Sequence, residues 1–398
     1  MICNVVINIG ILFVFKYYNF FAGELASFFS LNSNDFYIKL LLPVGISFYT
    51  FTAIGAIIDI YRNSENQHNL GLVPFMTFIS FFPLIMSGPI ERSTGLLAQI
   101  RKSRNFDTFL ITDGIIQIFW GLFKKMVLAD NCSIIANNAF GNYSDLPASS
   151  LAIGAIIYSL QIYFDFSGYS DIAIGISKTL GFKIRRNFRF PYFAVNVADF
   201  WKRWHMSLQS WFVDYIYIPL GGSRKSSLRT IINTFIVFLI CGIWHGANWT
   251  FVVWGIYHAI LFIPLILLFS KKFRRLSISD NQTFPNCKEL ILMIINFILI
   301  TIGWIIFNSD SLTDAFFYIK NLFSDSILDT PNGIGLSEYP YILFLIFIVL
   351  IIEWVQKSKE YALQFCSKTW VKVAIIYIII IHTILCSANQ SDFIYYQF

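Results

Sequence analysis

The sequence predicts an all-α, polytopic membrane protein, on the basis of its composition, its hydropathy and the recurrence of apolar runs. Of the 398 residues, 56% are hydrophobic and only 13% are charged, whereas soluble domains carry about 25% charged residues. The mean hydropathy is +0.63. A water-soluble core of this size cannot hide so much apolar surface, so the bilayer is the expected solvent for most of the chain.

Apolar runs recur along the whole chain, separated by polar stretches that are too short for a soluble catalytic domain. A spanning helix needs about 20 apolar residues; several runs are shorter or interrupted, which is tolerated where they are buried in protein or line a cavity. We expect about nine to eleven membrane helices, with re-entrant or interfacial ones, around a central tunnel in a single domain over residues 1–398. The candidate segments are Ile2–Phe15, Ile38–Ile60, Leu70–Ile90, Phe109–Ala129, Leu151–Phe166, Ile172–Phe182, Ile231–Ile243, Trp249–Phe269, Leu290–Phe307, Tyr341–Trp354 and Val371–Ser387.

The basic residues favour contact with membrane lipids over contact with nucleic acid. They cluster between the apolar runs, as is typical of cytoplasmic loops and headgroup contacts, and no basic surface module accompanies them. We therefore expect a multi-pass protein of the cell membrane, with Arg101–Arg104, Arg185–Arg186 and Lys271–Arg275 on the cytoplasmic side. The clusters are Arg101–Arg104, Lys124–Lys125, Lys183–Arg189, Arg224–Arg229, Lys271–Arg275 and Lys357–Lys359.

Residues 185–229 differ from the rest because they are too polar to span a bilayer yet rich in aromatic side chains. Trp201, Trp204, Leu208 and Trp211 recur at helical spacing with charged residues between them. This pattern predicts a helix lying in the headgroup plane, with its aromatic side chains inward and its cations at the phosphates.

His245 is the first candidate for chemistry because histidine is the side chain best suited to proton transfer near neutral pH. It lies in the stretch Cys241–Trp249, which interrupts two apolar segments. An ionisable residue at membrane depth is a functional candidate by default, although a histidine that only bonds a neighbouring helix fits the same pattern. Trp244 can wall an acyl pocket, and Asn248 can donate to an oxyanion.

His205 is a second candidate, against the alternative of a histidine packed in an interfacial aromatic belt. Beside it, Lys202 and Arg203 suit either the phosphates of a donor such as coenzyme A or lipid headgroups. Trp204 is grouped with them as a donor-binding candidate.

The sequence gives weaker support for a role of the remaining polar residues in the active site. Asp165 and Asp171 need partners at that depth, and both structural pairing with a cation and a role in the site remain open. For Glu91, Arg92 and His258, we expect structural roles. His68 and His382 have no supporting neighbours, and the cysteines and histidines show no zinc spacing, so no metal site is expected. Motifs for nucleotide binding, for a zinc protease or for a serine nucleophile are also missing.

Several stretches together resemble the membrane-bound O-acyltransferases, and in particular the bacterial branch that O-acetylates exported polysaccharides such as alginate and peptidoglycan. The D-alanyl transferase of teichoic acids is a more distant relative. The resemblance runs from about Leu41 to the C-terminus, in the family's order. It is carried by Leu42–Thr50 with Ile58–Arg62, Ser87–Arg92, Gly121–Asp130, Tyr163–Asp171, Asp199–His205, Asp214–Gly222, Gly242–Gly246 and Phe393–Phe398.

The resemblance implies that His245 is the catalytic histidine and that His205 is the second histidine often found near it. It implies an acyl group, most simply acetyl from acetyl-CoA as co-substrate with no bound cofactor, moved from a cytoplasmic thioester to hydroxyls of an exported cell-surface polysaccharide. The transfer is direct or passes through an extracytoplasmic acetyltransferase partner. Family members usually begin with one or two further helices before the region matching Ile2–Phe21, so this chain is expected to be short at its N-terminus.

Two other classes of membrane protein share some of these sequence features. A transporter or flippase for a polysaccharide or lipid-linked precursor has the same composition, interrupted helices and buried carboxylates, but paired repeat halves are not seen in the sequence. A polysaccharide synthase component normally brings a soluble nucleotide-sugar domain, and no polar stretch is long enough for one.

Overall fold

The computed structural model describes residues 1–62, 71–86, 88–269, 273, 276–279, 282–364, 369–388, 391, 393 and 394. Helices and irregular connections make up these residues, and no strand occurs among them. Five helical stretches are long and apolar enough to cross a membrane: Ile2–Phe28, Ala148–Thr179, Ser227–His245, Trp249–Leu267 and Cys287–Asn308. Pro340–Val355 and Trp370–Cys386 are shorter apolar helices. The predicted all-α membrane fold is confirmed.

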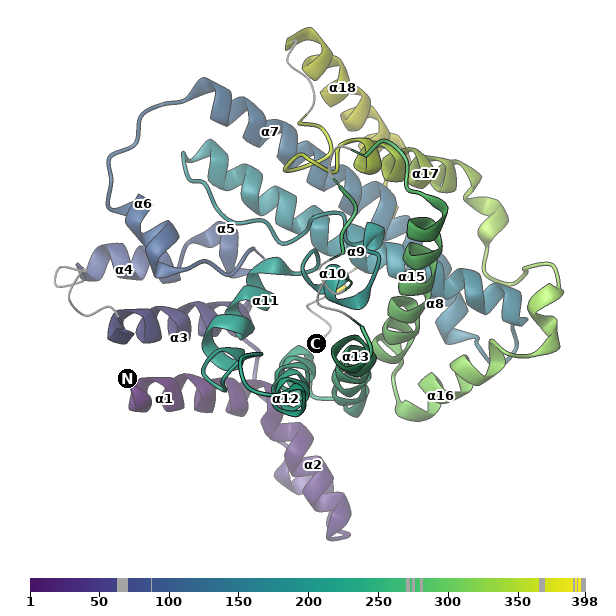
Figure 1. Cartoon of the computed structure of the whole chain (residues 1–398), viewed down its shortest axis with the longest axis horizontal. Coiled ribbons are helices and arrows are strands. Elements are labelled where there is room, and N and C mark those ends of the chain that lie inside the picture. The colour runs from purple at the N-terminus through teal and green to yellow at the C-terminus, as the bar shows by residue number, and fades with distance from the viewer. Residues whose placement is uncertain are drawn as a thin grey trace.

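Figure 1 shows α10 and α11 near the middle of the molecule, with α12 and α13 seen end-on below them and the longer helices α7 and α9 above. The principal helices are α1 (Ile2–Leu12), α2 (Tyr18–Phe28), α3 (Ile46–Arg62), α4 (Leu72–Ile79), α7 (Thr108–Phe123), α8 (Asp130–Gly141), α9 (Ala148–Thr179), α12 (Ser227–His245), α13 (Trp249–Leu267), α15 (Cys287–Asn308), α16 (Leu312–Asn321), α17 (Pro340–Val355) and α18 (Thr369–Cys386). The short helices are α5 (Phe82–Ile85), α6 (Ala98–Ile100), α10 (Val197–Trp201) and α11 (Met206–Phe212).

Several predicted segment boundaries are wrong, and two of them change how the helices connect. The runs Leu151–Phe166 and Ile172–Phe182 belong to one helix, α9, which continues through the polar residues between them. The first run continues beyond Phe15 through a π-helical turn, Phe13–Tyr17, into α2. Figure 1 shows α2 turning away from the direction of α1 at this turn.

The prediction of a helix in the headgroup plane is also wrong. The segment forms two short helices, α10 and α11, separated at His205, whose φ of 45° is incompatible with a continuous helix. Trp201, Trp204 and Trp211 are all buried in the main core. Their helical spacing reflects burial on several sides within the protein rather than one face against a bilayer surface.

The long helices α7 and α9 pack side by side at very close range (Figure 1). A Cβ atom at Gly121 would lie 2.5 Å from the carbonyl oxygen of Gly168, and one at Gly114 would lie 2.6 Å from that of Gly175. Small residues let membrane helices approach in this way. Besides α7, the helices α5, α8, α15 and α16 contact α9, which is therefore a long central support for this part of the bundle.

The charges of the connections separate along α9, which is 32 residues and so roughly 48 Å long. At its C-terminal end lie the connections with Arg104, Lys183 and Arg186, held by hydrogen bonds from Gln99 to Lys183 and from Arg186 to Lys359. At its N-terminal end lies the connection 309–339, held by hydrogen bonds of Ser150 with Asn332 and of Ala148 with Ser326. That connection contains Asp310, Asp314, Asp325, Asp329 and Glu338 against Lys320. We call these the basic end and the acidic end.

Candidate active site

His245 is the last residue of α12, where the chain turns sharply into α13. Gly246 continues in an extended conformation, and a Cβ atom there would lie 2.3 Å from the ring of Phe251, so only glycine fits this turn. Asn248 then caps α13 by accepting a hydrogen bond from the backbone N–H of Thr250 at 3.0 Å. A tight hairpin therefore holds the imidazole at a helix end, buried in the protein.

The walls around His245 are aromatic. Its ring lies 4.9 Å from that of Trp244, 5.0 Å from Trp254 and 5.2 Å from Phe307, measured between centroids. Three different helices, α12, α13 and α15, supply these rings. They fix the orientation of the imidazole and exclude water from most of its surface.

His205 reaches the same place from the break between α10 and α11. Its ring centroid lies 6.1 Å from that of Trp244, which also contacts His245. A left-handed conformation is unfavourable for a residue with a side chain. Backbone hydrogen bonds from Met206 to Asn187 and from Arg189 to Arg203, at 2.8 and 2.9 Å, hold the segment in place. The two predicted histidines are thus brought together.

His205 is neutral at physiological pH. Burial lowers its pKa to about 3, because the charged imidazolium would lose its hydration. A neutral imidazole beside the reaction centre can exchange a hydrogen bond without adding a positive charge. This supports a role in orienting groups near His245 rather than one in binding an anion.

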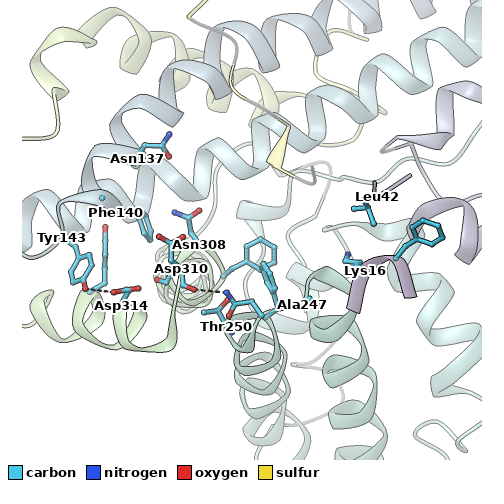
Figure 2. Close-up of a pocket in the computed structure, with 17 residues that line it drawn as sticks. Lys16, Leu42, Asn137, Phe140, Tyr143, Ala247, Thr250, Asn308, Asp310 and Asp314 are labelled. Carbon is cyan, nitrogen blue, oxygen red and sulfur yellow. Dashed lines mark hydrogen bonds between the residues drawn. The ribbon is translucent and has the colours of Figure 1, made fainter. Parts of the chain in front are cut away.

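Two cavities share Lys16 and Leu42 in their linings, and His245 lines the smaller one. The small cavity has a volume of about 160 Å³, and its lining includes Lys16, Ser47, Phe48, Trp244 and His245. The large cavity has a volume of about 880 Å³. Its polar lining includes Asn137, Tyr143, Asn248, Asn308, Asp310 and Asp314, shown in part in Figure 2. Its aromatic lining comes from Phe140, Phe251, Phe307 and Tyr318.

Lys16 lines both cavities, although the sequence does not single it out, because it lies just beyond the predicted first apolar run. Its ammonium donates hydrogen bonds to the carbonyl oxygens of Trp244 at 2.7 Å and His245 at 2.9 Å. The hydroxyl of Tyr17 donates to the carbonyl of Ile243 at 2.8 Å. The last carbonyls of a helix lack partners within it and carry partial negative charge, so Lys16 and Tyr17 together cap the helix that ends in His245.

Replacing Lys16 with methionine is expected to lower kcat by about 10- to 100-fold, because hydrogen bonds from a charged donor contribute about 1.5–3 kcal/mol. The KM for the acyl donor should stay within about twofold, since the change alters positioning rather than donor binding. Initial rates on purified protein measure both constants.

The control for this prediction is Lys39→Met, which removes an exposed lysine from the same N-terminal region. Lys16→Arg should recover part of the lost rate, because it keeps a cation at the helix end. Equal rates in Lys16→Met and Lys39→Met would contradict the positioning role.

Asp165 and Asp171 are paired with lysines rather than open to a substrate. Lys125 contacts Asp165 at 2.8 Å and Asp130 at 2.8 Å, and Lys124 contacts Asp171 at 2.6 Å. Both lysines are buried, so the prediction that Lys124–Lys125 forms a loop or headgroup cluster is wrong. Both lysines are buried because they form ion pairs with acidic residues of α9 inside the bundle.

The remaining predicted donor-site residues do not gather around His245. Arg203 is buried and contacts Asp199 at 3.0 Å and the hydroxyl of Ser277 at 2.8 Å, whereas Lys202 is exposed. Trp204 is buried against Trp304, with ring centroids 4.9 Å apart. Asn248 lines the large cavity, and its amide donates to the backbone carbonyl of Asp310 at 2.9 Å.

Glu91, Arg92 and His258, for which structural roles are predicted, each contact other residues of the protein. Arg92 contacts Asp214 at 2.8 Å, and Glu91 accepts the backbone N–H of Arg185 at 2.5 Å. His258 is fully buried and accepts a hydrogen bond from the indole of Trp201 at 3.4 Å. His68 lies outside the described residues, as do Lys271–Lys272, Arg274–Arg275, Ser87 and the residues after 394.

Comparison with known proteins places these features in a family. A model of the membrane-bound O-acyltransferase family matches residues 59–309, which is more than half of the chain and includes both histidines. The chain belongs to this family. The predicted enzyme class, an O-acyltransferase, is thereby confirmed, and the transporter alternative is set aside.

The relatives of this membrane-bound O-acyltransferase are named after different acceptors. The chain is 35% identical to a probable alginate O-acetylase AlgI of Azotobacter vinelandii, over 87% of this chain and 68% of the relative. It is 30% identical to a peptidoglycan O-acetyltransferase of Helicobacter pylori, over 100% and 82% respectively. A teichoic acid D-alanyltransferase of Bacillus subtilis is 32% identical over 56% and 58%. The chain spans 60% of the AlgI of Pseudomonas aeruginosa.

Proposed function

We propose that this membrane-bound O-acyltransferase moves an acetyl group from a cytoplasmic thioester, acetyl-CoA, to hydroxyls of an exported cell-surface polysaccharide. The transfer is direct or passes through an extracytoplasmic acetyltransferase partner. The observation that carries the proposal is the position of His245, which lines the small cavity and adjoins the large one through Lys16 and Ala247. The names of the alginate and peptidoglycan relatives support a polysaccharide acceptor.

In the proposed reaction, His245 acts as a general base toward the acceptor hydroxyl. The hydroxyl oxygen forms a bond to the acyl carbon while the carbon–sulfur bond of the thioester breaks. The proton taken by the imidazole passes to the departing thiolate, which leaves as the free thiol. No net charge is created, so the reaction suits a site enclosed by aromatic rings.

A covalent acyl-cysteine route through Cys241 is the alternative mechanism, since this residue is one helical turn before His245. Cys241 is buried, and it does not line either cavity. We therefore expect Cys241→Ala to retain at least about half of the wild-type rate in an initial-rate assay. A rate reduced to that of His245→Ala would establish the covalent route instead.

The charge distribution supports the direction of transfer. Cytoplasmic connections of membrane proteins carry an excess of Lys and Arg, which assigns the basic end to the cytoplasm of the cell that makes the protein. The donor would then enter from the basic end, and the acidic end with the large cavity would face outward. Cysteine labelling at residues 102 and 329 of intact cells should react only at position 329.

The test of the function is acetate released by mild alkali from cell-surface polymers. Wild-type cells, a deletion strain, and the deletion strain complemented with His245→Ala at equal protein level are compared. Loss of acetate in both mutant strains supports the function, and the polymer fraction that loses acetate identifies the acceptor. No change in the deletion strain would overturn the proposed acceptor class.

A further inference from the structure

We propose that the large cavity binds the acceptor and selects an uncharged, hydroxyl-rich sugar unit over a uronate or a phosphate-containing polymer. This inference rests on the proposed function and adds the chemical class of the acceptor. It is carried by the composition of the cavity wall, by its charge and by its position between the acidic end and His245.

The wall has the groups that recognise hydroxyls. The side chains of Asn137, Asn248 and Asn308 project amides that both donate and accept hydrogen bonds, and Asp310 adds a carboxylate that accepts them. Figure 2 shows Asn137, Phe140, Asn308 and Asp310 among the residues that line the cavity. Aromatic rings alongside such groups can pack against the C–H faces of a sugar ring. A volume of about 880 Å³ lies within the range of about 300–1,000 Å³ for ligand sites.

The charge of the wall disfavours an anionic acceptor. Asp314 accepts hydrogen bonds from Tyr143 at 2.8 Å and from Ser311 at 2.6 Å, and these bonds lower its pKa, so it is ionised at neutral pH. Asp310 is exposed at the same rim. Among the described residues that line the cavity, Lys16 is the one cation, and its ammonium is directed to the end of α12. A polyanion entering here would meet carboxylates without a compensating cation.

The position of the cavity fits a polymer that is modified outside the cytoplasm. Its rim is formed by α16, by the end of α8 and by the connection after α15, all at the acidic end. From this rim the wall continues inward through Phe307 and Ala247 to Lys16, which contacts the His245 carbonyl. The lining of the large cavity therefore extends from the acidic end to Lys16 and Leu42, which also line the small cavity together with His245.

The experiment uses the purified full-length chain in liposomes with radiolabelled acetyl-CoA and three soluble acceptors. These are an oligomer of N-acetylglucosamine, an oligomer of mannuronate and an oligomer of glycerol phosphate. Release of thiol and transfer of label to the acceptor are both measured at low salt. We expect kcat/KM for the uncharged oligomer to exceed that for either anionic one by at least about 10-fold.

Charge reversal gives the matched comparison. In the double variant Asp310→Lys with Asp314→Lys, the preference for the uncharged oligomer should shrink at least about 10-fold. The control is Asp325→Lys with Asp329→Lys, which makes the same change of charge in the same connection but outside the cavity. The control should keep the wild-type preference.

The possible outcomes distinguish failure of this inference from failure of the proposed acyltransferase function. Thiol release with label transferred to an anionic oligomer at an equal or higher kcat/KM than to the uncharged one would overturn the inference and leave the acyltransferase function standing. An equal shift in both double variants would also overturn it, because the effect would then be one of overall charge. No thiol release with any acceptor would overturn direct transfer and with it this inference, whereas the acetate released from wild-type and deletion cells tests the proposed function separately.

Discussion

Changing His245 to glutamine will lower the rate of acyl transfer by about 10²- to 10⁴-fold, the usual contribution of a general base. Glutamine keeps the size and polarity of the side chain but cannot take the hydroxyl proton. The helix end, the aromatic walls and both cavities should remain, because Lys16 and Tyr17 bind backbone carbonyls rather than the imidazole. The expected loss is therefore in kcat, with the KM for the donor nearly unchanged.

His258→Gln is the matched control for this prediction. His258 is also buried and also contacts Trp254, with ring centroids 4.9 Å apart, but it does not line either cavity. Initial rates of both variants at equal folded concentration decide the assignment. If His258→Gln lost as much activity as His245→Gln, the loss would reflect packing of buried histidines, and the base would have to be sought elsewhere.

Changing Lys125 to methionine will destabilise the protein by about 3–5 kcal/mol, the usual cost of leaving a buried charge without its partner. Lys125 contacts Asp165 and Asp130 at 2.8 Å each, and it donates to the backbone carbonyl of Ser391 at 3.0 Å. Both carboxylates are buried. Methionine fills the space of the lysine stem but leaves them facing each other without a cation.

Thermal unfolding in detergent, followed by loss of the monodisperse species, measures this effect. The triple variant with Lys125→Met, Asp165→Asn and Asp130→Asn should recover part of the lost stability, since it removes the buried charges together. Lys320→Met, at an exposed lysine, should change stability by less than about 0.5 kcal/mol. A Lys125→Met variant as stable as Lys320→Met would show that the pairs contribute nothing.

The sequence alone determined the properties that depend on local composition. An excess of apolar residues with few charges indicates a membrane solvent, and the long apolar runs then indicate the all-α class without a structure. His245 could be found because a histidine between two glycines interrupts an otherwise apolar stretch. His205 was a second candidate, and the resemblance to the family favoured a place near His245 over a place in an interfacial aromatic belt.

Only the tertiary structure decided which charged residues meet. Lys16 caps a helix end 229 residues away, and nothing in the sequence around Lys16 specifies that partner. Lys124 and Lys125 resembled a loop because pairing with α9 is invisible in a linear pattern, and the same pairing lets α9 continue through two aspartates. The physical reason is common to all of these: a buried charge is stabilised by whichever opposite charge or carbonyl the packing brings within about 3 Å, and packing is a property of the folded chain.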